Sequence, residues 1–380
     1  MIAILGPSPP DRGGIARETA LLSEELSRRG PVAYFTFSRR YPRWLDPRRF
    51  DVDPELGPSR ARPILDYRSP GSWKRAAVAI AAEKPEALIV PWWTGFWGLP
   101  VRALLRWLHR HRSETRRVLL CHNVEEHESG LLRRFLARGA FLSADAFVVH
   151  SEQDRERLAR ICPGRPTVVL PHPVAAASAP SKTDARRHLG LDDAPLVLFL
   201  GLVRRYKGVN LLLDAAPEIV RSTGARIAVV GEVFPDAEEL SRRAASSPVR
   251  DRIVWRDSYV SEEEMGVWLA ASDVVALPYR GVSGSGIAAR AFAAGRPVAA
   301  SKVGGLAEAV EPGVTGELFT DGDSTTLAAC VATVLARPRG FYAEGLARAA
   351  EKASWPRYVD ALLDFIGRIA DGRRPTAEGR

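Results

Sequence analysis

Cysteine is scarce in this sequence. The three cysteines, Cys121, Cys162 and Cys330, lie far apart and form no CxxC or Cys/His spacing. Their distribution argues against a zinc site and against a fold held together by disulfides. Free, buried thiols in a reducing compartment are the ordinary interpretation.

Long apolar runs are also missing from the 380 residues. A membrane-spanning helix needs roughly 18 or more consecutive apolar residues, and we expect none here. The N-terminus, MIAILGPSPP, has no basic region and too short an apolar run for a signal peptide. We therefore expect a cytoplasmic protein, either soluble or attached to the surface of a membrane.

What the sequence does contain is the composition of a folded protein with more than one domain. Hydrophobic residues make up 46% and charged residues 26%, which excludes a wholly disordered, collagen-like or coiled-coil chain. At roughly 150 residues per domain, the length favours two domains. The formal net charge of +9 favours an anionic partner, which is a nucleotide or phosphate, a nucleic acid, or an anionic membrane.

Short apolar segments alternate with helical patterns in both halves of the chain. Strands are expected at 2–5, 87–90 and 118–121 in the first half, and a second series begins at 196–200. This alternation predicts βαβ units, and hence an α/β protein with two Rossmann-like domains. The expected parts are a first domain, a linker, a second domain, and a C-terminal helix with its tail, at 1–175, 176–194, 195–352 and 353–380.

Two such domains are expected to face a cleft, because ligands of open parallel sheets bind beyond the carboxyl ends of the strands. In the second half, the loop GLVRRYKG (201–208) follows a strand and contains Arg204, Arg205 and Lys207. Cations at a strand end suit a diphosphate, whose charge must be stabilised as it leaves. A solvated basic turn would have the same sequence pattern.

A second loop in the same half is built from small residues. Ser283, Gly284, Ser285 and Gly286 come directly before a helical segment. Free N–H groups at the start of a helix, with the positive end of its dipole, could hold a phosphate. The alternative is a flexible loop whose serine caps the helix.

The first half offers further candidates at its strand ends. Gly13 and Gly14 precede a helix, which suits close approach of an anion but also a plain tight turn. His122 and Asn123 follow one strand, and His150 follows another. A histidine exposed at a strand end can bind a sugar or phosphate oxygen or transfer a proton, whereas a lone histidine is more often structural.

The segment PWWTGFWGLP (91–100) is rich in tryptophan. Trp92, Trp93 and Trp97 are expected in a loop at the rim of the cleft, where they could stack on an acceptor sugar or contact a lipid interface. The basic helix that follows, 101–117, could lie on an anionic bilayer. The alternative is a helix that packs on the sheet and has a solvated basic face.

Several segments, in their order along the chain, are similar to those of one known family. They are Gly201 with Lys207-Gly208, VVGEV with Gly231, SYVS before a helix, and then SDVVALPY, AFAAGRPVAAS, VGGLAE and PGVTGELF. The series resembles the retaining glycosyltransferases of family 4, the group 1 glycosyl transferases, which have the GT-B fold. The resemblance covers nearly the whole chain and implies that the last helix crosses back to the first domain.

For this chain, the resemblance implies a site for a nucleotide-sugar donor in the second domain. Lys207 and Arg204 would hold the diphosphate, and His122 would touch the transferred sugar. The other residues implied at the donor are Gly13, Gly14, Gly231, Tyr259, Val260, Ser283, Ser285, Gly286 and Ile287. On the acceptor side, the expected residues are Trp92, Trp93, Trp97 and Asn123.

The implied reaction moves a sugar to a glycan or lipid-linked acceptor with retention at the anomeric carbon, and it needs neither a metal nor a cofactor. Contact with an anionic membrane would fit such an acceptor, whereas no nucleic-acid recognition motif is present. The chain departs from the family's pattern at three places. Leu202 stands where the family has an arginine, and Val282 and Arg290 stand where it often has two glutamates. These departures leave the donor open, and they leave a catalytically silent GT-B binding protein as the alternative.

Overall fold

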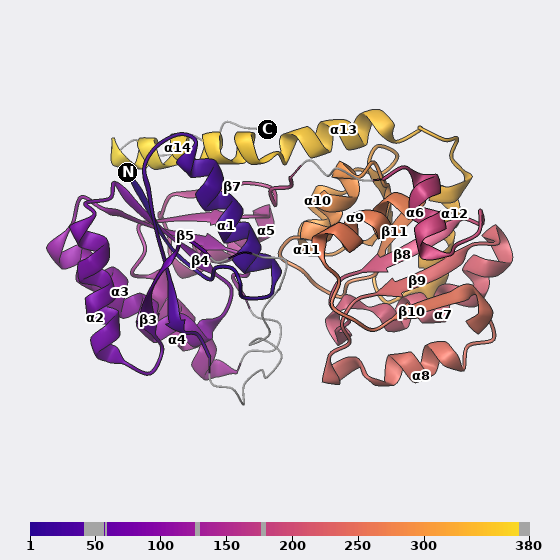
Figure 1. Cartoon of the computed structure of the whole chain (residues 1–380), viewed down its shortest axis with the longest axis horizontal. Helices are drawn as coiled ribbons and strands as arrows, with labels where there is room; N and C mark the ends of the chain where they lie inside the picture. Colours follow the sequence, from indigo (N-terminus) through magenta and orange to yellow (C-terminus); the bar gives the residue numbers. More distant parts are fainter. Residues whose placement is uncertain (42–56, 58, 126–129, 176–179, 372–380) are drawn as a thin grey trace. The chain divides into compact units, whose positions relative to one another are not determined.

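The computed structural model describes residues 1–41, 57, 59–125, 130–175 and 180–371, which divide into two compact units (Figure 1). Unit 1 contains Met1–Leu170 and the C-terminal segment that starts at Trp355. Unit 2 contains Pro171–Ser354. Of the expected linker, residues 176–179 lie outside the described part, and helix α6 (Lys182–Leu189) follows them.

Unit 1 is built on a sheet of seven parallel strands in the order β3-β2-β1-β4-β5-β6-β7. Every residue of β1 and β4 is buried, so continuous apolar runs rather than alternating patterns encode these central strands. The strands are β1 (Ile2–Leu5), β2 (Val32–Arg39), β3 (Arg62–Asp66), β4 (Ala87–Trp92), β5 (Arg116–Cys121), β6 (Ala146–Val149) and β7 (Thr167–Val169).

Helices cover both faces of this sheet. Successive side chains of a strand point to opposite faces, and alternate residues of β1 and β4 do belong to two separate apolar clusters. One cluster takes in α1 (Gly14–Ser27) and α14 (Trp355–Ala370), and the helix pair also makes direct contact. The other takes in α2 (Pro70–Ala82), α3 (Gly98–His111), α4 (Leu131–Phe141) and α5 (Glu152–Ile161). The last helix of the chain therefore belongs to unit 1.

Unit 2 has a sheet of six parallel strands in the order β10-β9-β8-β11-β12-β13. The strands are β8 (Leu196–Leu200), β9 (Arg226–Val230), β10 (Ile253–Arg256), β11 (Val274–Leu277), β12 (Val298–Ser301) and β13 (Gly316–Phe319). Besides α6, its helices are α7 (Val209–Thr223), α8 (Glu239–Ala245), α9 (Glu262–Ala271), α10 (Gly286–Ala293), α11 (Gly304–Ala309), α12 (Ser324–Ala336) and α13 (Ala343–Lys352). Sheet and helices share one apolar core.

The two sheets have the same switch point in strand order, where the chain begins to add strands on the other side of the first strand. β1 lies between β2 and β4, and β8 lies between β9 and β11. At such a point the connections leave the sheet in opposite directions, which opens a ligand-binding crevice at the carboxyl ends of the strands. The prediction of an α/β protein with two Rossmann-like domains is confirmed. Within the described residues, no helix combines the length and apolarity needed to cross a bilayer.

Candidate functional site

The loop after β8 is shaped by two glycines and is fixed to its neighbours. Gly208 has φ +68°, and a Cβ there would lie 1.7 Å from the carbonyl oxygen of Pro278, so only glycine fits this position. The N–H of Arg280 donates to the carbonyl of Tyr206 at 2.9 Å. This bond holds the basic loop against the segment that follows β11.

Lys207 is the cation that this loop presents at the sheet edge. Its side chain is half-buried, and its Nζ lies 3.9 Å from the centroid of the Tyr279 ring. Burial lowers the pKa of Lys207, because the charged form loses hydration. Among the described residues no carboxylate forms an ion pair with it. An ammonium group without a countercharge is suited to an anionic ligand.

Arg204 differs from Lys207 because it already has an acidic neighbour. Its Nε lies 3.7 Å from Oδ1 of Asp236, and its guanidinium lies 4.8 Å from the centroid of the Phe234 ring. Leu202, at the position where an arginine was expected, is exposed. Arg204 therefore lies on the side of the loop after β9, and a diphosphate would have to compete with Asp236 for it.

The small-residue loop converges on the same edge. Ser285 caps α10, since its Oγ accepts a hydrogen bond from the N–H of Ala288 at 3.3 Å. Within the described residues, the N–H groups of Gly286 and Ile287 donate no hydrogen bond, and the buried Oγ of Ser283 has no hydrogen-bond partner. The Ile287 side chain lies 3.7 Å from where a Cβ of Gly201 would stand. Open N–H donors at a helix start thus lie beside the basic loop.

Three further donor-side candidates line the neighbouring strand ends. A Cβ on Gly231 would lie 2.0 Å from the carbonyl oxygen of Gly201, so the loops after β8 and β9 touch there. Tyr259 is half-buried, whereas Val260 is buried in the core of unit 2. Only the backbone of Val260 can then face a ligand.

The two positions that lack glutamates have a clear structural role instead. Val282 packs against the core. Arg290, on α10, forms an ion pair with Glu262 at the start of α9. The sequence pattern did not indicate this pair, which places a carboxylate next to α10 from a different helix.

In unit 1, His122 is buried rather than exposed, contrary to the expectation. Only 8% of it is accessible, and its Nδ1 lies 3.9 Å from Oε2 of Glu18 on α1. Its ring centroid lies 5.4 Å from that of His150, whose Nδ1 bonds the Leu170 carbonyl at 2.9 Å. The strand ends of β5 and β6 thus bring together two histidines and a glutamate that sequence reasoning had not connected.

The paired glycines of unit 1 start α1. Gly13 has φ +122° and is the N-cap residue, and among the described residues no side chain caps this helix. A Cβ added to Gly13 or Gly14 would meet no described atom within 4 Å. No described residue therefore covers the backbone at the helix start, as an anion site requires, although packing alone does not demand glycine at Gly14.

The prediction of an exposed tryptophan-rich loop is wrong for two of its three residues. Trp92 is the last residue of β4, and both it and Trp97 are 2% exposed in the core of unit 1. Trp93 is half-buried, and its Nε1 donates to Tyr41 Oη at 2.7 Å. Asn123 Nδ2 lies 3.5 Å from the Trp93 carbonyl. Trp93 and Asn123 therefore remain the acceptor-side candidates.

The basic helix α3 packs on the sheet. Its apolar residues Val101, Leu104, Leu105 and Leu108 are all buried in the core of unit 1. The apolar face that a bilayer would need is therefore occupied, and Arg106 and Arg110 are exposed, which confirms the alternative of a packed helix with a solvated basic face. The helix ends at His111 rather than at 117, because Arg116 and Arg117 belong to β5.

Comparison with known proteins shows which proteins the chain is similar to. Residues 194–337 match the family model described as Glycosyl transferases group 1. Sucrose-phosphate synthase from Thermosynechococcus elongatus has a TM-score of 0.75 at 21% identity, over 98% of this chain and 99% of that one. Anabaena HepE in complex with UDP-glucose has a TM-score of 0.71 at 18% identity, over 98% and 100%. The fold is that of the GT-B glycosyltransferases.

Among curated proteins, the chain is similar to D-inositol 3-phosphate glycosyltransferases. It is 32% identical to that of Xylanimonas cellulosilytica over 249 residues, which are 61% of this chain and 59% of the relative. It is 32% identical to that of Mycolicibacterium gilvum over 239 residues, 60% of this chain and 53% of the relative. The chain thus spans between half and three fifths of the length of these relatives.

Proposed function

We propose that this protein is a glycosyltransferase that takes a sugar from a nucleotide-diphosphate-sugar. One observation carries the proposal, namely that Lys207, a half-buried cation with no carboxylate partner among the described residues, lies on the loop packed against the N-terminus of α10. The match of residues 194–337 to group 1 glycosyl transferases covers this site. The curated relatives are named glycosyltransferases, which supports the same class.

The diphosphate of the donor is held by the chain itself. Lys207 supplies a full positive charge, Arg204 a second, and the N–H groups of Ser285, Gly286 and Ile287 supply donors at the positive end of the α10 dipole. These groups stabilise the charge that develops on the departing diphosphate. The reaction needs no metal and no cofactor under this proposal.

We propose that the transfer step exchanges one bond at C1 of the sugar for another. The bond between C1 and the phosphate oxygen breaks, and the acceptor oxygen bonds C1 on the same face, so configuration is retained. The acceptor's proton passes to the departing phosphate oxygen.

The nucleotide base lies by Tyr259 and the backbone of Val260 and Gly231. Solved relatives include HepE with UDP-glucose and an Arabidopsis starch synthase with ADP, and both uracil and adenine are therefore worth testing. We propose a glycan or a lipid-linked saccharide as the acceptor, with Trp93 and Asn123 facing it.

The part of the proposal that concerns an anionic membrane rests on α4. Its apolar residues Leu131, Leu132 and Phe135 are 84%, 70% and 67% exposed. The arginines between and beside them are Arg133, Arg134 and Arg138. This composition is typical of interfacial helices. Phe135→Ser should reduce co-sedimentation with phosphatidylglycerol vesicles at low salt, and Arg106→Ser on α3 should not; equal loss in both would contradict this assignment.

Turnover tests the function. Purified protein is incubated with UDP-, GDP- and ADP-sugars in EDTA, and release of the nucleoside diphosphate is measured with and without a mixture of oligosaccharide acceptors. We expect release from one donor, faster with an acceptor and lost in Lys207→Ala. Lys352→Ala, an exposed lysine on α13, is the matched control and should behave as the unmodified protein. Tight nucleotide binding without release would favour a silent GT-B binding protein.

A further inference from the structure

A separate group of charged residues lies at the opposite edge of the unit 2 sheet, where the strands begin. Asp273 comes directly before β11, and Arg296 comes two residues before β12. β11 has four residues, and a rise of about 3.3 Å per residue gives roughly 13 Å of strand between the two edges. This group is therefore distinct from the candidate donor site.

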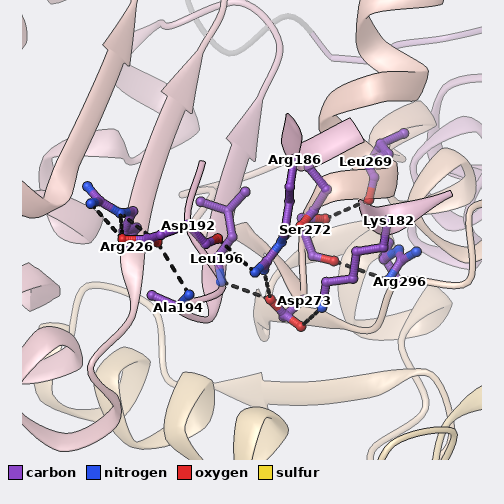
Figure 2. Close-up of polar contacts among 11 residues, drawn as sticks. Lys182, Arg186, Asp192, Ala194, Leu196, Arg226, Leu269, Ser272, Asp273 and Arg296 are labelled. Carbon is purple, nitrogen blue, oxygen red and sulfur yellow. Dashed lines mark hydrogen bonds and ion pairs between the residues drawn. The ribbon is translucent and has the colours of Figure 1, made fainter. Parts of the chain in front are cut away.

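Asp273 is at the centre of the group (Figure 2). Its Oδ1 accepts from Lys182 Nζ, and its Oδ2 accepts from Arg186 Nη2 at 2.6 Å. The N–H of Leu196 also donates to Oδ2, at 2.9 Å. Both carboxylate oxygens of Asp273 accept hydrogen bonds, so the side chains of Lys182 and Arg186 already share this single negative charge.

Arg296 is a third cation beside the same carboxylate (Figure 2). Its Nη1 donates to the carbonyl oxygen of Ser272 at 3.1 Å, while its buried Nε has no acceptor among the described residues. Burial lowers the pKa of Arg296, Asp273 opposes the shift, and the charges of Arg186 and Arg339 add to it. Burial also lowers the pKa of Lys182. The group is short of negative charge.

A cavity of about 300 Å³ lies beside these cations. Its lining includes Lys182, Arg296 and the turn after α12, with Arg337, Arg339 and Phe341. Of the described residues, Asp273 is the only one that contributes a carboxylate to this lining. The guanidinium of Arg337 lies 4.7 Å from the centroid of the Phe341 ring. Arg339 is exposed and makes no hydrogen bond or ion pair with the part of the chain that the structure describes. The volume suits a small organic ligand.

We propose that this cavity binds a small phosphorylated molecule, with its phosphate among Arg296, Arg337 and Arg339. Guanidinium groups bind phosphate oxygens through paired, charge-assisted hydrogen bonds. The Phe341 ring offers apolar surface to the rest of the molecule. The ligand supplies the negative charge that the protein lacks here, and it is bound without taking part in the transfer reaction.

Isothermal titration calorimetry with the full chain tests the proposal at constant ionic strength. Lys207→Ala is the background, so that phosphate binding at the candidate donor site does not contribute. Inorganic phosphate and glucose 6-phosphate are titrated in separate arms. We expect saturable one-to-one binding of both, with the ester tighter because it fills more of the cavity. Binding of inorganic phosphate alone would overturn the assignment to a phosphorylated organic molecule.

Two variants locate the binding. Arg339→Gln alters an exposed side chain and so leaves the fold intact, and Arg296→Gln removes the buried guanidinium; each should weaken binding about tenfold or more. Arg242→Gln, which alters another exposed arginine of unit 2, is the matched control. Absence of saturable binding, or equal weakening in Arg242→Gln and Arg339→Gln, would overturn the proposal. Nucleotide binding should be unchanged in Arg339→Gln, so failure of this proposal and failure of the proposed function are separable.

Discussion

Replacing Lys207 by alanine should impair binding while leaving the fold almost unchanged. No carboxylate among the described residues is left unpaired by this change. The variant loses the contact of Nζ with the Tyr279 ring, worth about 0.5–1 kcal/mol, and it also removes a charge that is costly to bury. The free energy of unfolding without ligand should therefore change by less than about 1 kcal/mol.

The effect on nucleotide binding should be much larger. A hydrogen bond to a charged group contributes about 1.5–3 kcal/mol, so the Kd of the preferred nucleoside diphosphate should rise about 10- to 100-fold. Ligand at 100 times the Kd of the unmodified protein adds about 2.7 kcal/mol to its stability. A tenfold weaker site would leave about 1.4 kcal/mol. Calorimetry gives the Kd, and urea unfolding with and without ligand gives the stability.

The pH dependence adds a second readout. Burial lowers the pKa of Lys207 from its ordinary 10.5. Nucleotide affinity should fall as pH rises through this lowered pKa, because the neutral amine attracts the diphosphate less. Between the lowered pKa and 10.5 the unfolded state binds more protons, so the stability of the free protein should rise with pH there. An unchanged Kd in Lys207→Ala, or a loss of several kcal/mol without ligand, would refute the reasoning.

Three further substitutions test the packing around the site and the fold. Gly208→Ala should lower the free energy of unfolding, measured by urea titration, by more than about 2 kcal/mol. The reason is that the residue has φ +68° and that a Cβ would lie 1.7 Å from the Pro278 oxygen. An unchanged free energy of unfolding would show that the loop is mobile. Ser285→Ala should cost about 1 kcal/mol through loss of the α10 cap, and a cost near zero would mean that the cap contributes nothing. Leu362→Ala, fully buried on α14, should cost about 2–5 kcal/mol, and a cost below 1 kcal/mol would mean that α14 packs loosely on unit 1.

The central strands that the sequence pattern indicated are buried on both faces. Leu196–Leu200 and Val274–Leu277 are continuous apolar runs in the middle of a sheet. Three strands had no such signal, namely β3 (Arg62–Asp66), β7 (Thr167–Val169) and β13 (Gly316–Phe319). All three are short edge strands that contain half-buried residues, so pairing with a neighbour, rather than local pattern, determines them.

The candidate site was predictable where it follows from topology. The rule that ligands bind at strand ends placed the loops at 201–208 and 283–286, and the structure brings Ile287, the residue after the second loop, beside Gly201 in the first. Spacing could not show that Asp236 lies beside Arg204, or that Trp97 packs in the core. Such facts depend on long-range packing. The cavity beside Asp273 could not be predicted from the sequence for the same reason, since the cations that line it lie far apart in the chain, from Lys182 to Arg339.

The most direct test of the account is a crystal structure of the protein with the nucleoside diphosphate that stabilises it most. The account predicts the diphosphate at the start of α10, with its oxygens in hydrogen-bond distance of the Gly286 and Ile287 N–H groups and of Lys207 Nζ. A diphosphate bound elsewhere on the chain, or at this edge without contact to Lys207, would contradict the central claim.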